Sequence, residues 1–166
     1  MKHSVIVVPG LITAVRLPLL SRGNMPWICN FSRFDLYSGY SFKKDKLFKY
    51  KSDCVLIQIS AFDINTYPKG LSDWVREKNR HRFFFHYVKK TDHGFDQTKP
   101  SQQDIDKIHS ILAKALAENL NVIVQCDIGV SRSGAIALFG VEMGFKNVGN
   151  CKNVNVYLYE QLKLKL

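Results

Sequence analysis

Residues 122–134 read VIVQCDIGVSRSG, and our prediction of the fold starts from this segment. The apolar, β-branched run at 122–124 predicts a buried strand that ends at Cys126. The next five residues, 127–131, include a glycine and predict a tight loop, and the apolar run at 135–143 predicts a helix. The predicted unit is therefore a strand, a short loop and a helix, with a thiol at the end of the strand.

Strand and helix patterns alternate along much of the remaining chain. Apolar runs predict strands at 4–8, 26–31, 53–60 and 82–88, the last two of them buried, and helical spacing predicts helices at 71–78, after Ser101 and at 154–164. This alternation indicates an α/β fold with a central, mainly parallel sheet flanked by helices. The length of 166 residues indicates a single domain, 1–166, in which residues 1–50 carry no recognisable motif.

The loop and the start of the following helix form a favourable place for an anion. A loop that leads into a helix N-terminus directs several backbone N–H groups to one point, where the helix dipole adds partial positive charge. Such an environment also favours a thiolate over a thiol. Arg132, six positions after Cys126, carries a planar guanidinium that can bind two phosphate oxygens at once. These residue types predict a nucleophilic sulfur and an anion receptor on one loop.

Cys126 and Arg132 are separated by five residues, and Ser133 follows the arginine. This pattern resembles the signature loop of the cysteine-dependent protein phosphatases, and the sequence CDIGVSRS is most similar to the loop of their dual-specificity branch. The resemblance implies that Cys126 attacks phosphorus and that Ser133 donates to the sulfur when it leaves. It also implies that the phosphate is held by Arg132 and by the backbone of the loop residues Asp127, Ile128, Gly129, Val130 and Ser131. The alternative is a buried cysteine at the end of a core strand, with Arg132 an ordinary solvated residue.

A phosphatase of this kind also needs an acid that protonates the leaving oxygen. The resembled family carries an aspartate on a loop upstream of the nucleophile, after a strand and before a helix. Two aspartates in the polar stretch 89–100 meet that description, Asp92 and Asp96. We favour Asp92 because it lies closer to the end of the strand predicted at 82–88, and Asp96 stays open. We expect no metal site there, since Asp92, His93 and Asp96 have no further apparent ligand, and we expect no cofactor.

One position departs from the family pattern. The family usually has a histidine immediately before its nucleophile, where this chain has Gln125. We therefore expect slower turnover, with a phosphate-binding module of weak turnover as the alternative. Relatives with the same loop act on inositol lipids or on RNA 5′ phosphates, so these substrates stay open beside phosphotyrosine, phosphoserine and phosphothreonine in proteins.

The charge of the chain agrees with an anionic partner. The net charge is +10, and basic residues are concentrated at 43–51 and 76–90. A basic surface attracts phosphorylated proteins, inositol lipids or nucleic acid. A basic RNA-binding domain is therefore a third hypothesis.

The spacing of the cysteines and the hydropathy of the sequence indicate in which cellular compartment the protein is located. The four cysteines form no CxxC pair and no zinc-like spacing with the five histidines. Cys54 is predicted in the core, with a protective disulfide to Cys126 as the alternative. We expect a cytoplasmic protein without integral membrane association, because a catalytic thiolate requires a reducing compartment and no segment is long and apolar enough to span a bilayer.

Overall fold

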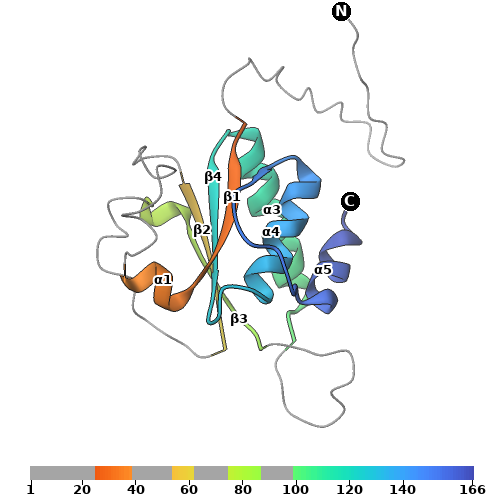
Figure 1. Cartoon of the computed structure of the whole chain (residues 1–166). Coiled ribbons are helices and arrows are strands. Elements are labelled where there is room, and N and C mark those ends of the chain that lie inside the picture. Colours follow the sequence, from red (N-terminus) through yellow and green to blue (C-terminus); the bar gives the residue numbers. More distant parts are fainter. Residues whose placement is uncertain (1–24, 39–53, 62–74, 87–98) are drawn as a thin grey trace, which may run out of the picture.

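The structure is a computed structural model that describes residues 25–38, 54–61, 75–86 and 99–166. Within these ranges, five strands form one sheet in the order β3-β2-β4-β1-β5, and every neighbouring pair is parallel (Figure 1). The strands are β1 (Trp27–Ser32), β2 (Cys54–Ser60), β3 (Arg80–Phe84), β4 (Asn121–Cys126) and β5 (Lys146–Asn147). The predicted α/β class with a parallel sheet is confirmed. The strand predicted at 4–8 lies outside the described residues.

Helices cover both faces of this sheet, unequally. They are α1 (Arg33–Ser38), α3 (Gln102–Ala117), α4 (Arg132–Met143) and α5 (Val156–Lys163), with a 3-10 helix, η3, at Glu77–Asn79. Helices α3, α4 and α5 pack on one face and α1 on the other (Figure 1). None of the helices in the described ranges is long and apolar enough to cross a membrane.

Side-chain alternation explains the two core layers. In β2, Val55, Ile57 and Ile59 belong to the larger core cluster beneath α3–α5, whereas Leu56 belongs to the smaller cluster beneath α1. In a strand, successive side chains point to opposite faces, so a strand that is apolar at every position is covered on both sides. The predicted inner position of this strand is confirmed, since β2 lies between β3 and β4.

The helix α3 begins at the residue that the sequence indicated. Ser101 is the N-cap: its side chain accepts a hydrogen bond from the backbone N–H of Asp104, and the Asp104 carboxylate accepts from the Ser101 backbone N–H at 2.9 Å. This reciprocal capping satisfies two N–H groups that a helix N-terminus would otherwise leave unpaired. The buried face includes Ile105, Ile108 and Leu112, which places α3 firmly against the sheet.

Two predictions around β3 need correction. Among the described residues the strand covers Arg80–Phe84 and lies at the edge of the sheet, and Phe84 is 45% exposed, whereas residues 87–88 of the predicted strand lie outside the described ranges. His86 follows the strand and is half-buried. The helix predicted at 71–78 does not reach its predicted end, because Arg76 is extended and only η3 follows it, while residues 71–74 lie outside the described ranges.

The register brings four strand ends to one edge of the sheet. Ser32 of β1 lies opposite Cys126 of β4, and Ser60 of β2 lies opposite Phe84 of β3. Because all strands are parallel, these are all carboxyl ends, where ligands bind in open α/β sheets. The candidate site lies at this edge.

Candidate active site

Cys126 lies at the end of β4 within the larger hydrophobic core cluster, and its sulfur contacts two polar groups. The residue is 1% exposed, and its Sγ accepts a hydrogen bond from the backbone N–H of Gly129 at 3.2 Å. Its Sγ is also 3.1 Å from the hydroxyl oxygen of Ser133, and either atom can donate. Helix α4 starts at Arg132, directly after the loop. The structure therefore brings Cys126, Gly129 and Ser133 together.

The loop backbone is held in place by segments far away in the sequence. Gly129 has a φ of 79°, and its carbonyl accepts a hydrogen bond from the Asn30 side-chain amide at 2.7 Å. The carbonyl of Ser131 accepts from the backbone N–H of Asn155 at 3.0 Å. Sequence reasoning missed Asn30, which is buried on β1; a polar residue near the carboxyl end of a strand was the signal that could have found it.

Arg132 is buried, which contradicts the reading of it as an ordinary solvated residue. Its side chain is 8% exposed, and its two terminal nitrogens donate to the Phe85 carbonyl and the Asp127 carboxylate, each at 2.6 Å. A guanidinium has five N–H donors. The three that remain have no partner among the described residues. The guanidinium is thus oriented by two protein oxygens and keeps donors for another ligand.

Asp127 connects Arg132 to a second arginine. Its carboxylate pairs with Arg132 on one oxygen and with the Arg33 guanidinium on the other, and the Arg33 backbone N–H donates to the Asp127 carbonyl at 3.3 Å. Arg33 also donates to the hydroxyl of Ser60 at 2.9 Å. The prediction for Asp127 concerned its backbone, so the bridging role of its carboxylate is a new finding. Arg33 lies 94 positions away, and local spacing could not reveal it.

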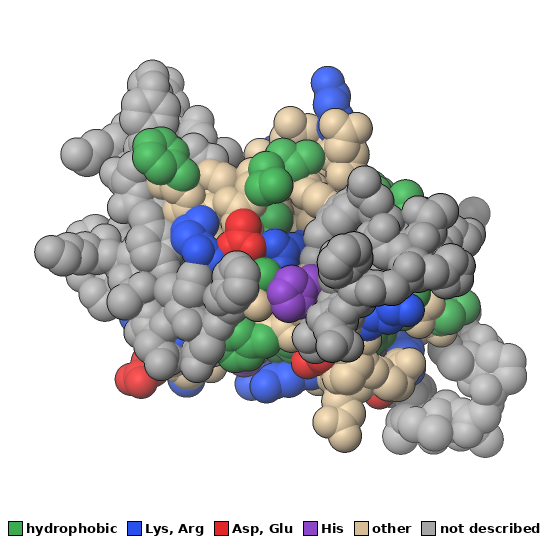
Figure 2. All heavy atoms as spheres, turned by 90° about the horizontal axis from the view of Figure 1, so that it is seen from below, with side chains coloured by type: hydrophobic (Ala, Val, Ile, Leu, Met, Phe, Trp, Pro, Cys, Tyr) green, Lys and Arg blue, Asp and Glu red, His purple; other side chains and the backbone are tan. Residues whose placement is uncertain are grey.

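The surface around this cluster is mixed. Seen from the carboxyl edge, basic and acidic side chains lie next to each other near the middle of the face, with hydrophobic side chains beside them (Figure 2). Ile128, in the loop, is 76% exposed. The hydroxyl of Ser131 is buried and has no hydrogen-bond partner among the described residues. Asp92, His93 and Asp96 lie outside the described ranges.

The other three cysteines have different surroundings. Cys29 and Cys54 are buried in the smaller core cluster, and Cys54 begins β2 opposite Asn121, at the far end of β4 from Cys126. The alternative of a disulfide between Cys54 and Cys126 is therefore wrong, and none of the four cysteines forms a disulfide. Cys151 is half-buried; burial raises the pKa of its thiol, although its contact with Asn147 acts in the opposite direction.

Neither a family model nor a curated protein matches the chain in comparisons with known proteins. The function must therefore be argued from the site itself.

Proposed function

We propose that the protein is a phosphatase of the dual-specificity type that hydrolyses phosphate monoesters through a phosphocysteine intermediate. Its proposed substrates are phosphotyrosine and, beyond it, phosphoserine and phosphothreonine in proteins. One observation carries the proposal: the Cys126 sulfur lies within hydrogen-bond distance of the Gly129 N–H and the Ser133 hydroxyl, on the loop that leads into α4, whose first residue is Arg132. A nucleophile, an anion receptor and a donor to the sulfur are what this chemistry requires.

In the first step, the Cys126 thiolate attacks phosphorus, an S–P bond forms and the bond to the leaving oxygen breaks. The phosphoryl oxygens repel a nucleophile unless their charge is balanced. Arg132 has three N–H donors beyond its contacts with Phe85 and Asp127, and these can bind phosphoryl oxygens. A proton from an acid goes to the leaving oxygen.

In the second step, water attacks phosphorus, the carboxylate left when the acid gave up its proton takes a proton from that water, and the S–P bond breaks. The departing sulfur again carries negative charge, and donors that already contact it stabilise that charge without reorganisation. Gly129 and Ser133 are placed to donate in this way, since their nitrogen and oxygen lie 3.2 and 3.1 Å from the sulfur.

A phosphate-binding module with weak turnover is the second candidate. Two observations favour it: Arg132 already donates to a carboxylate and a carbonyl, and Gln125 stands immediately before Cys126. An anionic ligand would have to share the Arg132 guanidinium with the Asp127 carboxylate. Arg132 would then stabilise the transition state little more than it stabilises the bound substrate, and only that difference accelerates the reaction.

Hydrolysis and trapping distinguish the two candidates. The protein is incubated with an aryl phosphate, a phosphotyrosine peptide, a phosphoserine peptide, an inositol phospholipid and a 5′-phosphorylated RNA, then quenched in acid and digested. We expect release of phosphate from the aryl and phosphotyrosine substrates, and a phosphate adduct on the peptide that contains Cys126. A Cys151→Ser variant should behave like the wild type. Binding of phosphosubstrates without turnover or adduct identifies a binding module, and preferential release from the lipid or RNA reassigns the substrate.

For the acid we propose Asp92, with Asp96 as the alternative. Replacing the acid by asparagine removes the proton donor, which is worth about 10²- to 10⁴-fold in rate when the leaving group is poor. We expect Asp92→Asn to slow hydrolysis of phenyl phosphate by at least about 10²-fold, and to have a smaller effect on p-nitrophenyl phosphate, whose leaving oxygen is already stable as an anion. Asp96→Asn is the matched control. If Asp92→Asn leaves phenyl phosphate hydrolysis unchanged, the assignment is wrong.

A further inference from the structure

A buried side chain of β1 connects the loop before α4 to a third part of the chain. Asn30 is 7% exposed, and its amide nitrogen donates to the carbonyl of Gly129 and to the carbonyl of Asn150, each at 2.7 Å. An amide nitrogen of this kind has two N–H donors, so both are used. The Asn30 side chain therefore joins β1, the loop that carries Gly129, and the segment between β5 and α5.

Asn30 lies on the same face of the sheet as Cys126. It is paired in register with Val124, two residues before Cys126, and both Val124 and Cys126 belong to the core cluster beneath α3–α5. In a strand, side chains two positions apart point to the same face. The Asn30 amide thus reaches the loop from the side on which α4 packs.

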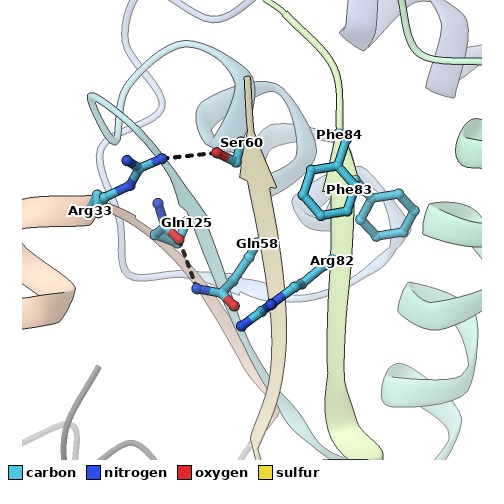
Figure 3. A pocket seen from close by; sticks show the side chains of 7 residues that line it. All are labelled: Arg33, Gln58, Ser60, Arg82, Phe83, Phe84 and Gln125. Atoms are coloured by element: carbon cyan, nitrogen blue, oxygen red, sulfur yellow. Dashed lines mark hydrogen bonds between the residues drawn. The ribbon is translucent and has the colours of Figure 1, made fainter. Parts of the chain in front are cut away.

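Two other buried amides near the candidate site point to the opposite face. Gln125 directly precedes Cys126 on β4, and successive strand residues face opposite sides of a sheet. The Gln125 amide oxygen accepts a hydrogen bond from the amide of Gln58 on β2 at 3.0 Å (Figure 3). This pair therefore joins β2 to β4, whereas Asn30 holds the Gly129 carbonyl.

The backbone of Gly129 is held on both of its sides. Its N–H donates to the Cys126 sulfur at 3.2 Å, and its carbonyl accepts from Asn30. Because both groups belong to one residue, loss of the Asn30 bond also releases the N–H that contacts the sulfur. A donated hydrogen bond stabilises a charged sulfur more than a neutral thiol, so the position of this N–H affects how much of the thiol is ionised.

Gly149 shows how closely the Asn30 amide is enclosed. A Cβ at position 149 would lie 2.3 Å from the side-chain oxygen of Asn30 and 2.8 Å from its backbone nitrogen. A methyl group there must therefore displace the amide or the strand that carries it. Substitution of Gly149 is a second way to disturb the amide, without removing it.

We infer that Asn30 is a positioning residue that keeps the Gly129 N–H on the Cys126 sulfur and thereby favours the thiolate form of Cys126. Asn30 acts through the loop backbone rather than on the substrate. The inference rests on the proposed function, because it concerns the nucleophile of that reaction.

Alkylation of Cys126 by iodoacetamide, followed by mass spectrometry of the digested protein, tests the inference without any turnover. The thiolate is the reactive form. At mildly acidic pH, Cys126 of the wild type should react faster than Cys151, since burial raises the pKa of the Cys151 thiol. Asn30→Ala should slow the reaction of Cys126 about tenfold, the scale of one hydrogen bond to a charged group, and Gly149→Ala should slow it as well. A merely looser structure would expose the sulfur, which is now in a residue only 1% exposed, and would speed the reaction.

Asn121→Ala is the matched control. Asn121 also joins β1 to β4 through its side chain, whose oxygen accepts from the backbone N–H of Trp27 at 3.0 Å, but it lies at the far end of β4 from Cys126. This variant should lose stability and keep the wild-type rate of Cys126 alkylation. The unfolding midpoint of each variant shows whether it is folded.

Two results would overturn the inference. One is a wild type in which Cys126 reacts no faster than Cys151, and the other is a folded Asn30→Ala or Gly149→Ala protein whose Cys126 reacts at the wild-type rate or faster. If the wild type also hydrolyses phosphate esters, the second result leaves the proposed function standing. Slower alkylation in both variants of a protein that shows no turnover supports the inference and counts against the proposed function alone.

Discussion

Replacing Cys126 by serine is expected to lower the hydrolysis of an aryl phosphate by about 10⁴-fold or more, the scale seen when an enzyme loses its nucleophile. A hydroxyl is nearly isosteric with the thiol but is a far weaker nucleophile near neutral pH. The hydrogen-bonding neighbours of the sulfur, Gly129 and Ser133, can equally well contact an oxygen. Initial rates with the wild type and the variant, at matched concentrations, give the comparison.

The same variant should still bind phosphosubstrates. Affinity for a phosphotyrosine peptide, measured by fluorescence anisotropy, should stay within a few-fold of the wild type, because the guanidinium of Arg132 is unchanged. Adding Arg132→Ala should weaken binding by roughly tenfold to a hundredfold, since each hydrogen bond to a charged group is worth about 1.5–3 kcal/mol. Equal turnover by wild type and Cys126→Ser removes the sulfur from the mechanism.

The hypothesis of a basic RNA-binding domain predicts a different result for the Arg132→Ala variant. Tight, salt-sensitive RNA binding that is indifferent to Arg132→Ala favours that hypothesis over the phosphatase.

Replacing Gly129 by alanine is expected to cause the second-largest loss. A Cβ at this position would lie 2.1 Å from the Ser32 backbone nitrogen and 2.5 Å from the Phe31 carbonyl carbon. These are backbone atoms of β1, which cannot move without disturbing the sheet, and the φ of 79° is unfavourable for alanine. The loop must therefore shift, and the N–H that contacts the Cys126 sulfur shifts with it.

We expect Gly129→Ala to reduce kcat/KM by about 10²- to 10³-fold, the effect of losing one fixed donor in an active site. Its free energy of unfolding should fall by about 1–3 kcal/mol because of the steric clash. Gly144→Ala is a matched control: its φ of 120° is also positive, but its Cβ would meet only Leu116, at 3.7 Å, at the far end of α4. That variant should lose stability and keep its activity. Wild-type activity in Gly129→Ala contradicts the proposed role of the loop.

Local patterns predicted the central unit of the fold well. The strand, loop and helix around Cys126 follow from a β-branched run, a glycine and an apolar helical stretch, and the structure has β4, the loop and α4 in these places. The parallel sheet follows from the alternation of strands and helices. The prediction for residues 82–88 was less successful, because an apolar run does not reveal whether a strand lies at the edge or in the middle of a sheet.

Local sequence is enough to bring a thiol, a glycine loop, an arginine and a helix start together, because all four lie within seven positions and need only local backbone geometry. The residues that surround these four come from distant parts of the chain. Three contacts join residues that are 67 to 99 positions apart in the sequence: Arg33 with Asp127, Asn30 with Gly129, and Gln58 with Gln125. Asp127 also pairs with Arg132, which is only five positions away. Such contacts depend on strand order and register, which place distant residues at one sheet edge and which no local pattern encodes.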